Sequence, residues 1–166
     1  MKKIFSKAFV ALLFPFFLSI AGCGPELPEG MPKLYPCTLT ITQDGKPLEG
    51  ASVILFSMDP NISKWASNGV TDSSGNVVMK TQGKYDGAAA GDYKVLVTKI
   101  IVEEGVVLQA ETETTPEKSI PGKTFSYVEQ QYGDPLKCPL TLTVSTGKTT
   151  ETLDVGKYVK EEIRSN

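Results

Sequence analysis

The sequence predicts an all-β protein built as a single antiparallel β-sandwich. Three observations predict this fold. Short runs of alternating apolar and polar residues recur along the chain, turn-forming residues separate them, and the chain carries no convincing helix of ten or more residues. Strands at this spacing, with turn signals between them, are typical of antiparallel sandwiches.

Strand and turn signals alternate from residue 37 onward. The turn pair Asp44-Gly45 follows the first strand, CTLTIT, and DSSGN at residues 72–76 supplies the next turn. A short helix fits only residues 159–163, within a polar tail of residues 159–166. The expected strands are, in order, residues 37–42, 52–56, 66–71, 76–80 and 93–97, and then a hairpin over residues 139–155 that turns at Thr146-Gly147.

Residues 1–22 have the features of an export signal. Three lysines precede an apolar run, residues 8–20, which is about as long as a secretory signal and too short to span a bilayer. Pro15 within the run argues further against a regular membrane helix.

The segment IAGC, residues 20–23, resembles the lipobox of bacterial lipoproteins. The resemblance implies that the Cys23 thiol receives a diacylglyceryl group and that a peptidase cuts before this residue. The other interpretation is an ordinary secretory signal followed by an unrelated cysteine. Gly24 stands where lipoproteins kept on the inner membrane tend to have aspartate, which favours the outer membrane if the cell has one. We therefore expect an exported protein, held on the membrane of the bacterial cell envelope by its N-terminal lipid.

A proline-rich linker, residues 23–36, follows the signal and precedes a domain expected over residues 37–158. The linker holds four prolines and lacks hydrophobic periodicity. An extended linker of this length holds a domain on the order of 40 Å from a membrane, at about 3.1 Å per residue. These prolines are Pro25, Pro28, Pro32 and Pro36.

Composition excludes several classes of function. The formal net charge is −2, and lysine and arginine do not cluster, so we do not expect a nucleic-acid partner. The chain contains no histidine, which removes Ser-His-Asp and Cys-His catalysis and histidine-ligated zinc or iron. No cofactor or metal site is therefore expected, and the protein is not expected to be an enzyme.

Three cysteines are present, and Cys37 and Cys138 remain as a pair if Cys23 carries lipid. Each of the two continues the apolar face of its strand, and an oxidising compartment favours a disulfide. The pair would meet if the two strands ran side by side and parallel, or faced each other across the core. Two free, buried thiols are the other interpretation.

Three segments in order resemble the carboxypeptidase regulatory-like, or transthyretin-like, domains of bacterial surface proteins: TITQDGKPLEGASVILF, GVTDSSGNVVMKT and AAAGDYKVLVTK. Val78 departs from the family pattern, where an aromatic residue is often found, and Ala90 replaces its usual proline. The resemblance implies a sandwich of seven or eight strands of the prealbumin type. It also implies a role in stalks, adhesion, or binding of proteins or glycans.

Three aromatic residues are candidates for a contact surface. Trp65 lies in a polar neighbourhood where an exposed indole could stack on a ligand, although burial at a strand start is the alternative. Tyr127 and Tyr132 end the long segment of residues 100–131, which forms either a contact patch or a loop packed back on the domain. The same segment carries an acidic run that is expected to be solvated: Glu103, Glu104, Glu111, Glu113 and Glu117.

Two functions are compatible with these residues. The first is a noncatalytic, membrane-anchored surface or periplasmic lipoprotein that binds an envelope protein or a glycan, or that adds structure. The second is a hydrolase, or an accessory subunit, that acts on envelope polysaccharide with carboxylates alone.

Overall fold

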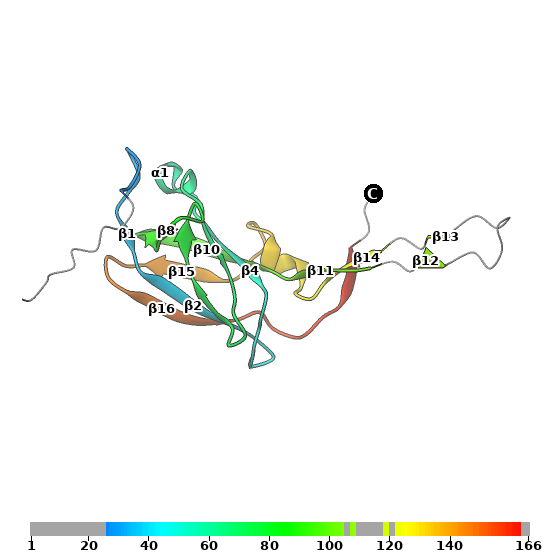
Figure 1. Ribbon diagram of the computed structural model, residues 1–166. Helices are drawn as coiled ribbons and strands as arrows, with labels where there is room; N and C mark the ends of the chain where they lie inside the picture. The colour runs from blue at the N-terminus through cyan, green and yellow to red at the C-terminus, as the bar shows by residue number, and fades with distance from the viewer. Residues whose placement is uncertain (1–25, 105–106, 109–117, 120–121, 164–166) are drawn as a thin grey trace, which may run out of the picture.

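The computed structural model describes residues 26–104, 107–108, 118–119 and 122–163. The chain is mostly β, as predicted, with several antiparallel sheets (Figure 1). The helical segments among these residues are α1 (Pro60–Ser63) and the 3-10 turn η1 (Gln130–Gly133). The strands are β1 (Leu34–Tyr35), β2 (Cys37–Gln43), β3 (Lys46–Pro47), β4 (Ser52–Phe56), β5 (Ser67–Val70), β6 (Asn76–Val78), β7 (Lys80–Thr81), β8 (Tyr85–Asp86), β9 (Ala88–Ala89), β10 (Gly91–Thr98), β11 (Ile100–Glu103), β12 (Val107–Leu108), β13 (Lys118–Ser119), β14 (Lys123–Ser126), β15 (Thr141–Val144), β16 (Thr149–Asp154) and β17 (Glu161–Ile163).

Two sheets form the body. The larger has the strand order β15-β10-β4-β5-β7-β8, and the smaller has the order β16-β2-β3 with β6 also paired to β2. Of the pairings that the structure describes, only β2 with β16 is parallel, and it sets Cys37 beside Thr149. Strand β1 pairs with β9, so the fold already begins inside the segment predicted to be linker.

Alternating side chains of the two sheets meet in one core. Along β2 and β10 the odd-numbered apolar residues are buried, as their spacing predicted. Burial of each such side chain stabilises the fold by roughly 1.5 to 3 kcal/mol. The core residues contributed by β2, β4, β10 and β15 include Leu39, Ile41, Val53, Leu55, Tyr93, Val95, Val97, Leu142 and Val144.

The hairpin predicted over residues 139–155 is not formed. Strand β15 pairs with β10 in the larger sheet, whereas β16 pairs with β2 in the smaller one. The turn at residues 145–148 therefore carries the chain from one sheet to the other. Both strands turn one apolar face toward the same core, so their alternation alone did not distinguish neighbours in one sheet from neighbours across the core.

The disulfide predicted between Cys37 and Cys138 is wrong, because both are free, buried thiols. Strand β15 begins at Thr141, three residues after Cys138, and ends at Val144, and the chain then turns to place Thr149 beside Cys37. The two cysteines therefore lie toward opposite ends of the body. Strand β15 alone spans about 10 Å and Cys138 lies before its start, whereas a disulfide needs Cα atoms within about 7 Å.

A three-stranded sheet with the order β11-β14-β17 projects from one end of the body (Figure 1). We call these strands the distal arm. Part of the predicted solvated segment is thus built into strands, and the C-terminal residues predicted as a tail or short helix supply β17. Gln43 ties the arm to the body, because its buried amide donates to the Tyr127 carbonyl at 2.9 Å and to the Lys157 carbonyl at 3.2 Å.

We expect Gly75→Ala to lower the free energy of unfolding by about 3 kcal/mol, measured by urea denaturation. Gly75 has φ +74°, and an added Cβ would lie 2.5 Å from the Ile41 carbonyl oxygen. Gly83→Ala is the matched control, because Gly83 has φ +67° but open space around it. It should cost about 1 kcal/mol, the strain of the left-handed backbone alone. Equal losses in the two variants would contradict the close packing at Gly75.

We expect Cys37 and Cys138 to be alkylated by iodoacetamide in denaturant without any reductant, and to resist alkylation in the native protein. Burial raises the pKa of the Cys37 thiol from 9.0 to about 11, so its reactive thiolate is about 100-fold scarcer near neutral pH. The Cys138 thiol is enclosed and donates to the Val95 carbonyl at 3.2 Å. Peptide mapping by mass spectrometry identifies the labelled residues. A non-reduced peptide pair joined through these two cysteines would contradict the fold.

Candidate functional site

The three aromatic candidates do not form one surface. Trp65 lies just after α1, Tyr127 lies at the base of the distal arm, and Tyr132 lies in the core. The length of β10 separates Trp65 from Tyr127. Near α1, Lys94 of β10 pairs with Phe56. At the other end, the carbonyl of Lys99, which follows β10, accepts a hydrogen bond from the Tyr127 N–H. Trp65 and Tyr127 therefore belong to two separate candidate sites, one beside α1 and one on the distal arm.

The larger site is an open groove of about 620 Å³ beside α1. We call it the α1 groove. Its floor is the outward face of β4, β10 and β15, and its wall is the loop that leads into α1. The Asp59 carboxylate caps α1 by accepting from the Asn61 N–H at 2.8 Å, and Pro60 begins the helix, so a short helix that the sequence did not predict fixes this wall.

The floor of the α1 groove exists because β10 alternates. Tyr93, Val95 and Val97 enter the core, so Asp92 and Lys94 face outward between β4 and β15. Asp92 accepts a hydrogen bond from the Thr143 hydroxyl at 2.6 Å. The Lys94 ammonium donates to the Cys138 carbonyl at 3.0 Å. The groove floor thus offers a carboxylate, an ammonium and hydroxyl groups in defined positions.

The wall of the α1 groove carries apolar side chains beside the Asp59 carboxylate. Phe56 is half-buried in the floor beside it, Ile62 of α1 packs against the core, and Met58 is 79% exposed. A flexible thioether at this position adapts to ligands of different shape. The groove therefore combines an apolar side with polar groups, the usual lining of a binding pocket.

Trp65 is half-buried next to the α1 groove and outside the main core. It shares a small hollow of about 80 Å³ with Phe56 and Ile62. Its indole Nε1 is enclosed without a hydrogen-bond partner among the described residues. The indole thus supports the groove wall rather than projecting into solvent as a free stacking platform.

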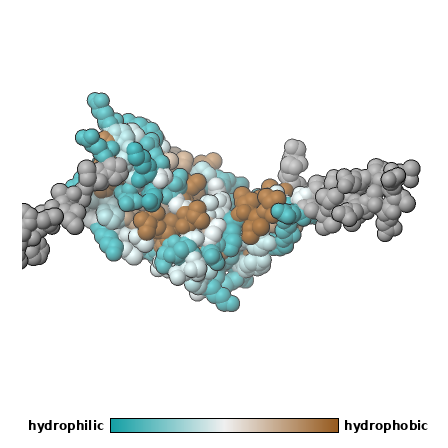
Figure 2. Space-filling view, viewed as in Figure 1, coloured by the Kyte–Doolittle hydropathy of each residue, from teal (hydrophilic) through white to brown (hydrophobic). Residues whose placement is uncertain are grey.

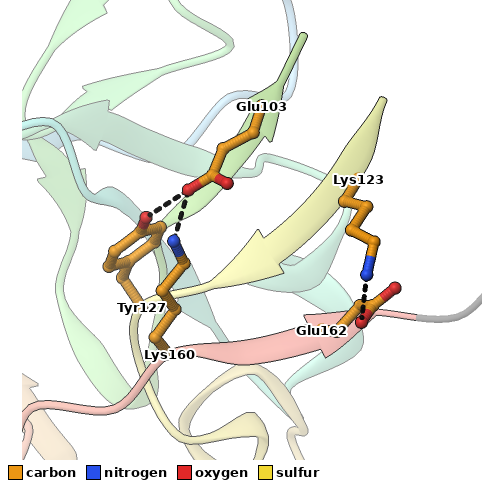
Figure 3. Close-up of polar contacts among 5 residues, drawn as sticks. All are labelled: Glu103, Lys123, Tyr127, Lys160 and Glu162. Atoms are coloured by element: carbon orange, nitrogen blue, oxygen red, sulfur yellow. Dashed lines mark hydrogen bonds and ion pairs between the residues drawn. The ribbon is translucent and has the colours of Figure 1, made fainter. Parts of the chain in front are cut away.

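Tyr127 belongs to a polar cluster on the distal arm (Figure 3). Its hydroxyl donates to the Glu103 carboxylate at 3.3 Å, and the Lys160 ammonium donates to the same oxygen. Lys160 holds the pKa of Glu103 below its usual value, and Glu103 raises the pKa of Lys160. Lys160 also lies 4.3 Å from the centroid of the Phe125 ring. These contacts link side chains from the three segments whose backbones pair as one sheet in the arm.

Tyr132 is 8% exposed and packs in the core, so the prediction that it contributes to a contact surface is wrong. The turn η1 directs it inward, where its hydroxyl oxygen lies 3.1 Å from the site of a Cβ at Gly156. Burial raises the pKa of Tyr132. An aromatic residue in a polar stretch gave no sign of this orientation, because a 3-10 turn has neither of the periodicities that reveal a buried face.

Other residues singled out from the sequence lie in turns or outside the described residues. The Asp72 carboxylate accepts from the Ser74 and Asn76 N–H groups at 2.8 and 2.9 Å, as in a β-turn. Among residues 26–104, 107–108, 118–119 and 122–163, no group of three or more His, Cys, Asp or Glu is placed to hold a metal. Lipidation of Cys23, the signal at residues 1–22, and Glu111, Glu113 and Glu117 fall outside the described part of the chain.

Comparisons with known proteins give no further guide to the site. The chain matches no family model, no curated protein and no solved structure. In the part of the chain that the structure describes, no helix has the length and apolar character needed to cross a membrane.

Proposed function

We propose that this protein is a noncatalytic, membrane-anchored lipoprotein of the bacterial cell envelope, whose domain is a β-sandwich of the transthyretin-like class that binds an envelope protein or a glycan. The observation that carries the proposal is the α1 groove, with apolar side chains along its wall and polar groups on its floor. Such a lining suits a ligand that has an apolar face and hydroxyl or amide groups along one edge.

Anchoring through Cys23 explains how the domain is presented. The lipobox-like segment ends at Cys23, and β1 begins at Leu34, so the linker between them is shorter than the sequence suggested. Fully extended, it spans on the order of 30 Å at about 3.1 Å per residue. Two or three acyl chains on one cysteine hold a protein on a bilayer far longer than one chain does.

A carboxylate hydrolase is the second candidate, because Asp59 and Asp92 both line the α1 groove. Each of these carboxylates already accepts a hydrogen bond from this chain, Asp59 from Asn61 and Asp92 from Thr143. Those bonds give both groups a structural task, which favours binding over catalysis.

We expect the full-length protein, purified in detergent, to bind a component of envelope extracts or of a glycan array with saturable affinity and without product formation. Met58→Arg should weaken binding at least about tenfold, because it places a large charge at the apolar wall of the groove. Leu136→Arg is the matched control, since Leu136 is 89% exposed and does not line the groove. Equal affinity of both variants would contradict binding in the groove, and glycan turnover that disappears in Asp92→Asn would favour the hydrolase instead.

We expect mass spectrometry of the protein purified from its native membrane to find an N-terminal peptide that begins at Cys23 and carries a diacylglyceryl thioether. Cys23→Ser should abolish attachment of the lipid, because the serine hydroxyl is a much weaker nucleophile than a thiolate. Val78→Ser is the control for the substitution itself, because Val78 is an exposed residue of the domain. A mature chain with an unmodified cysteine at position 23 would contradict the anchor.

A further inference from the structure

Strand β11 is an unusual edge strand. Among the described residues it pairs only with β14, so its other edge is open. Its side chains Ile100, Ile101 and Val102 are 56%, 41% and 64% exposed. Figure 2 shows an apolar area over this part of the molecule. Edge strands that stay unpaired usually carry charged or polar side chains, because a flat apolar edge invites another strand.

The open edge of β16 provides the contrast. This strand pairs only with β2 among the described residues, and its exposed side chains are threonine, glutamate and aspartate. The body therefore protects one of its edges in the usual way, while the distal arm does not.

The hydrogen-bond pattern of the arm decides which backbone groups β11 offers. The Tyr127 N–H donates to the Lys99 carbonyl at 2.8 Å, in the same register that pairs Ile101 with Phe125. In an antiparallel ladder, hydrogen-bonded pairs alternate with unbonded pairs. Residues Lys99, Ile101 and Glu103 therefore direct their backbone groups toward β14. Ile100 and Val102 direct theirs toward the open edge.

We propose that a second copy of this chain pairs antiparallel with the open edge of β11, about a two-fold axis at Ile101. Ile100 of each copy then forms a hydrogen-bonded pair with Val102 of the other. A register shifted by one residue is excluded, because it would set an outward-facing backbone group against an inward-facing one.

Charge selects this register from those that the backbone permits. With Ile101 opposite Ile101, Lys99 of each copy lies opposite Glu103 of the other. A shift by two residues in either direction loses both of these pairs. Opposite charges at the two ends of a self-paired strand make the edge complementary to itself, as a two-fold interface requires.

The apolar side chains gain a shared face in this arrangement. Across the arm, Val102 pairs with Thr124, which in turn pairs with Ile163. Ile100, Val102 and Ile163 therefore lie on one face, and the second copy adds the same three residues beside them. Pairing would shield side chains that each copy alone leaves in water.

The contact is short. Thr98 already pairs with Ser52, so the ladder between the two copies is confined to the stretch from Lys99 to Glu103. Such an interface is smaller than those of permanently assembled dimers, and we expect a weak dimer that depends on protein concentration. The arm leaves the body at the end opposite α1 (Figure 1), so the groove of each copy stays open.

Ile101→Cys tests the pairing in the full-length protein within bacterial envelopes. Facing residues of an unbonded antiparallel pair have Cα atoms about 4.5 Å apart, which suits a disulfide. On a non-reducing gel after mild oxidation, we expect most of the variant at twice the monomer mass. Val78→Cys is the matched control, because Val78 is 56% exposed on β6 of the smaller sheet. Unmodified chain, run alongside, accounts for any linkage through the native cysteines.

Charge reversal tests the register. Lys99→Glu, added to Ile101→Cys, should reduce the cross-linked fraction at least about threefold, because it sets two carboxylates opposite each other at both ends of the paired strands. Circular dichroism of each variant confirms that the domain is folded. Equal cross-linking of the Ile101→Cys and Val78→Cys variants, or none in either, overturns the pairing. Cross-linking of Ile101→Cys that is insensitive to Lys99→Glu overturns the proposed register.

Discussion

The burial of alternating side chains along β2 and β10 is the constraint on which the rest of the structure depends. Because one face of each strand enters the shared core, a slip of one residue would expose the whole apolar set. The same alternation directs Asp92 and Lys94 outward into the α1 groove. Where the chain continues past the core as β11, no other sheet of the described residues covers it, so both of its faces are exposed and the distal arm becomes a surface.

Strand direction explains why the cysteines do not meet. Strand β16 runs parallel to β2, and the turn at residues 145–148 reverses the chain between β15 and β16. Strand β2 therefore runs antiparallel to β15, and the starts of β2 and β15 lie at opposite ends of the body. Each cysteine instead serves as a small apolar side chain in the core. The burial that raises the pKa of Cys37 to about 11 also keeps its thiol unreactive.

The distal arm is held by polar contacts instead of a core. Glu103 receives Lys160 and Tyr127 on one face, and Lys123 lies 3.2 Å from Glu162 beside them (Figure 3). These groups are exposed, and exposed ion pairs stabilise a fold only slightly. The backbone ladders from β11 to β14 and from β14 to β17 set the register, and these side-chain pairs link the same strands across it.

The sequence by itself determined the all-β class, the positions of most strands in the body, and the inward faces of β2, β10 and β15, because alternation and turn chemistry are local properties. It also determined that histidine chemistry is absent. Only the tertiary structure decided that β15 and β16 join different sheets, that Tyr132 is buried, and that residues 161–163 complete the arm. Strand partners, strand directions and the α1 groove arise from contacts between segments far apart in the chain. Local sequence patterns do not determine which of these segments pair.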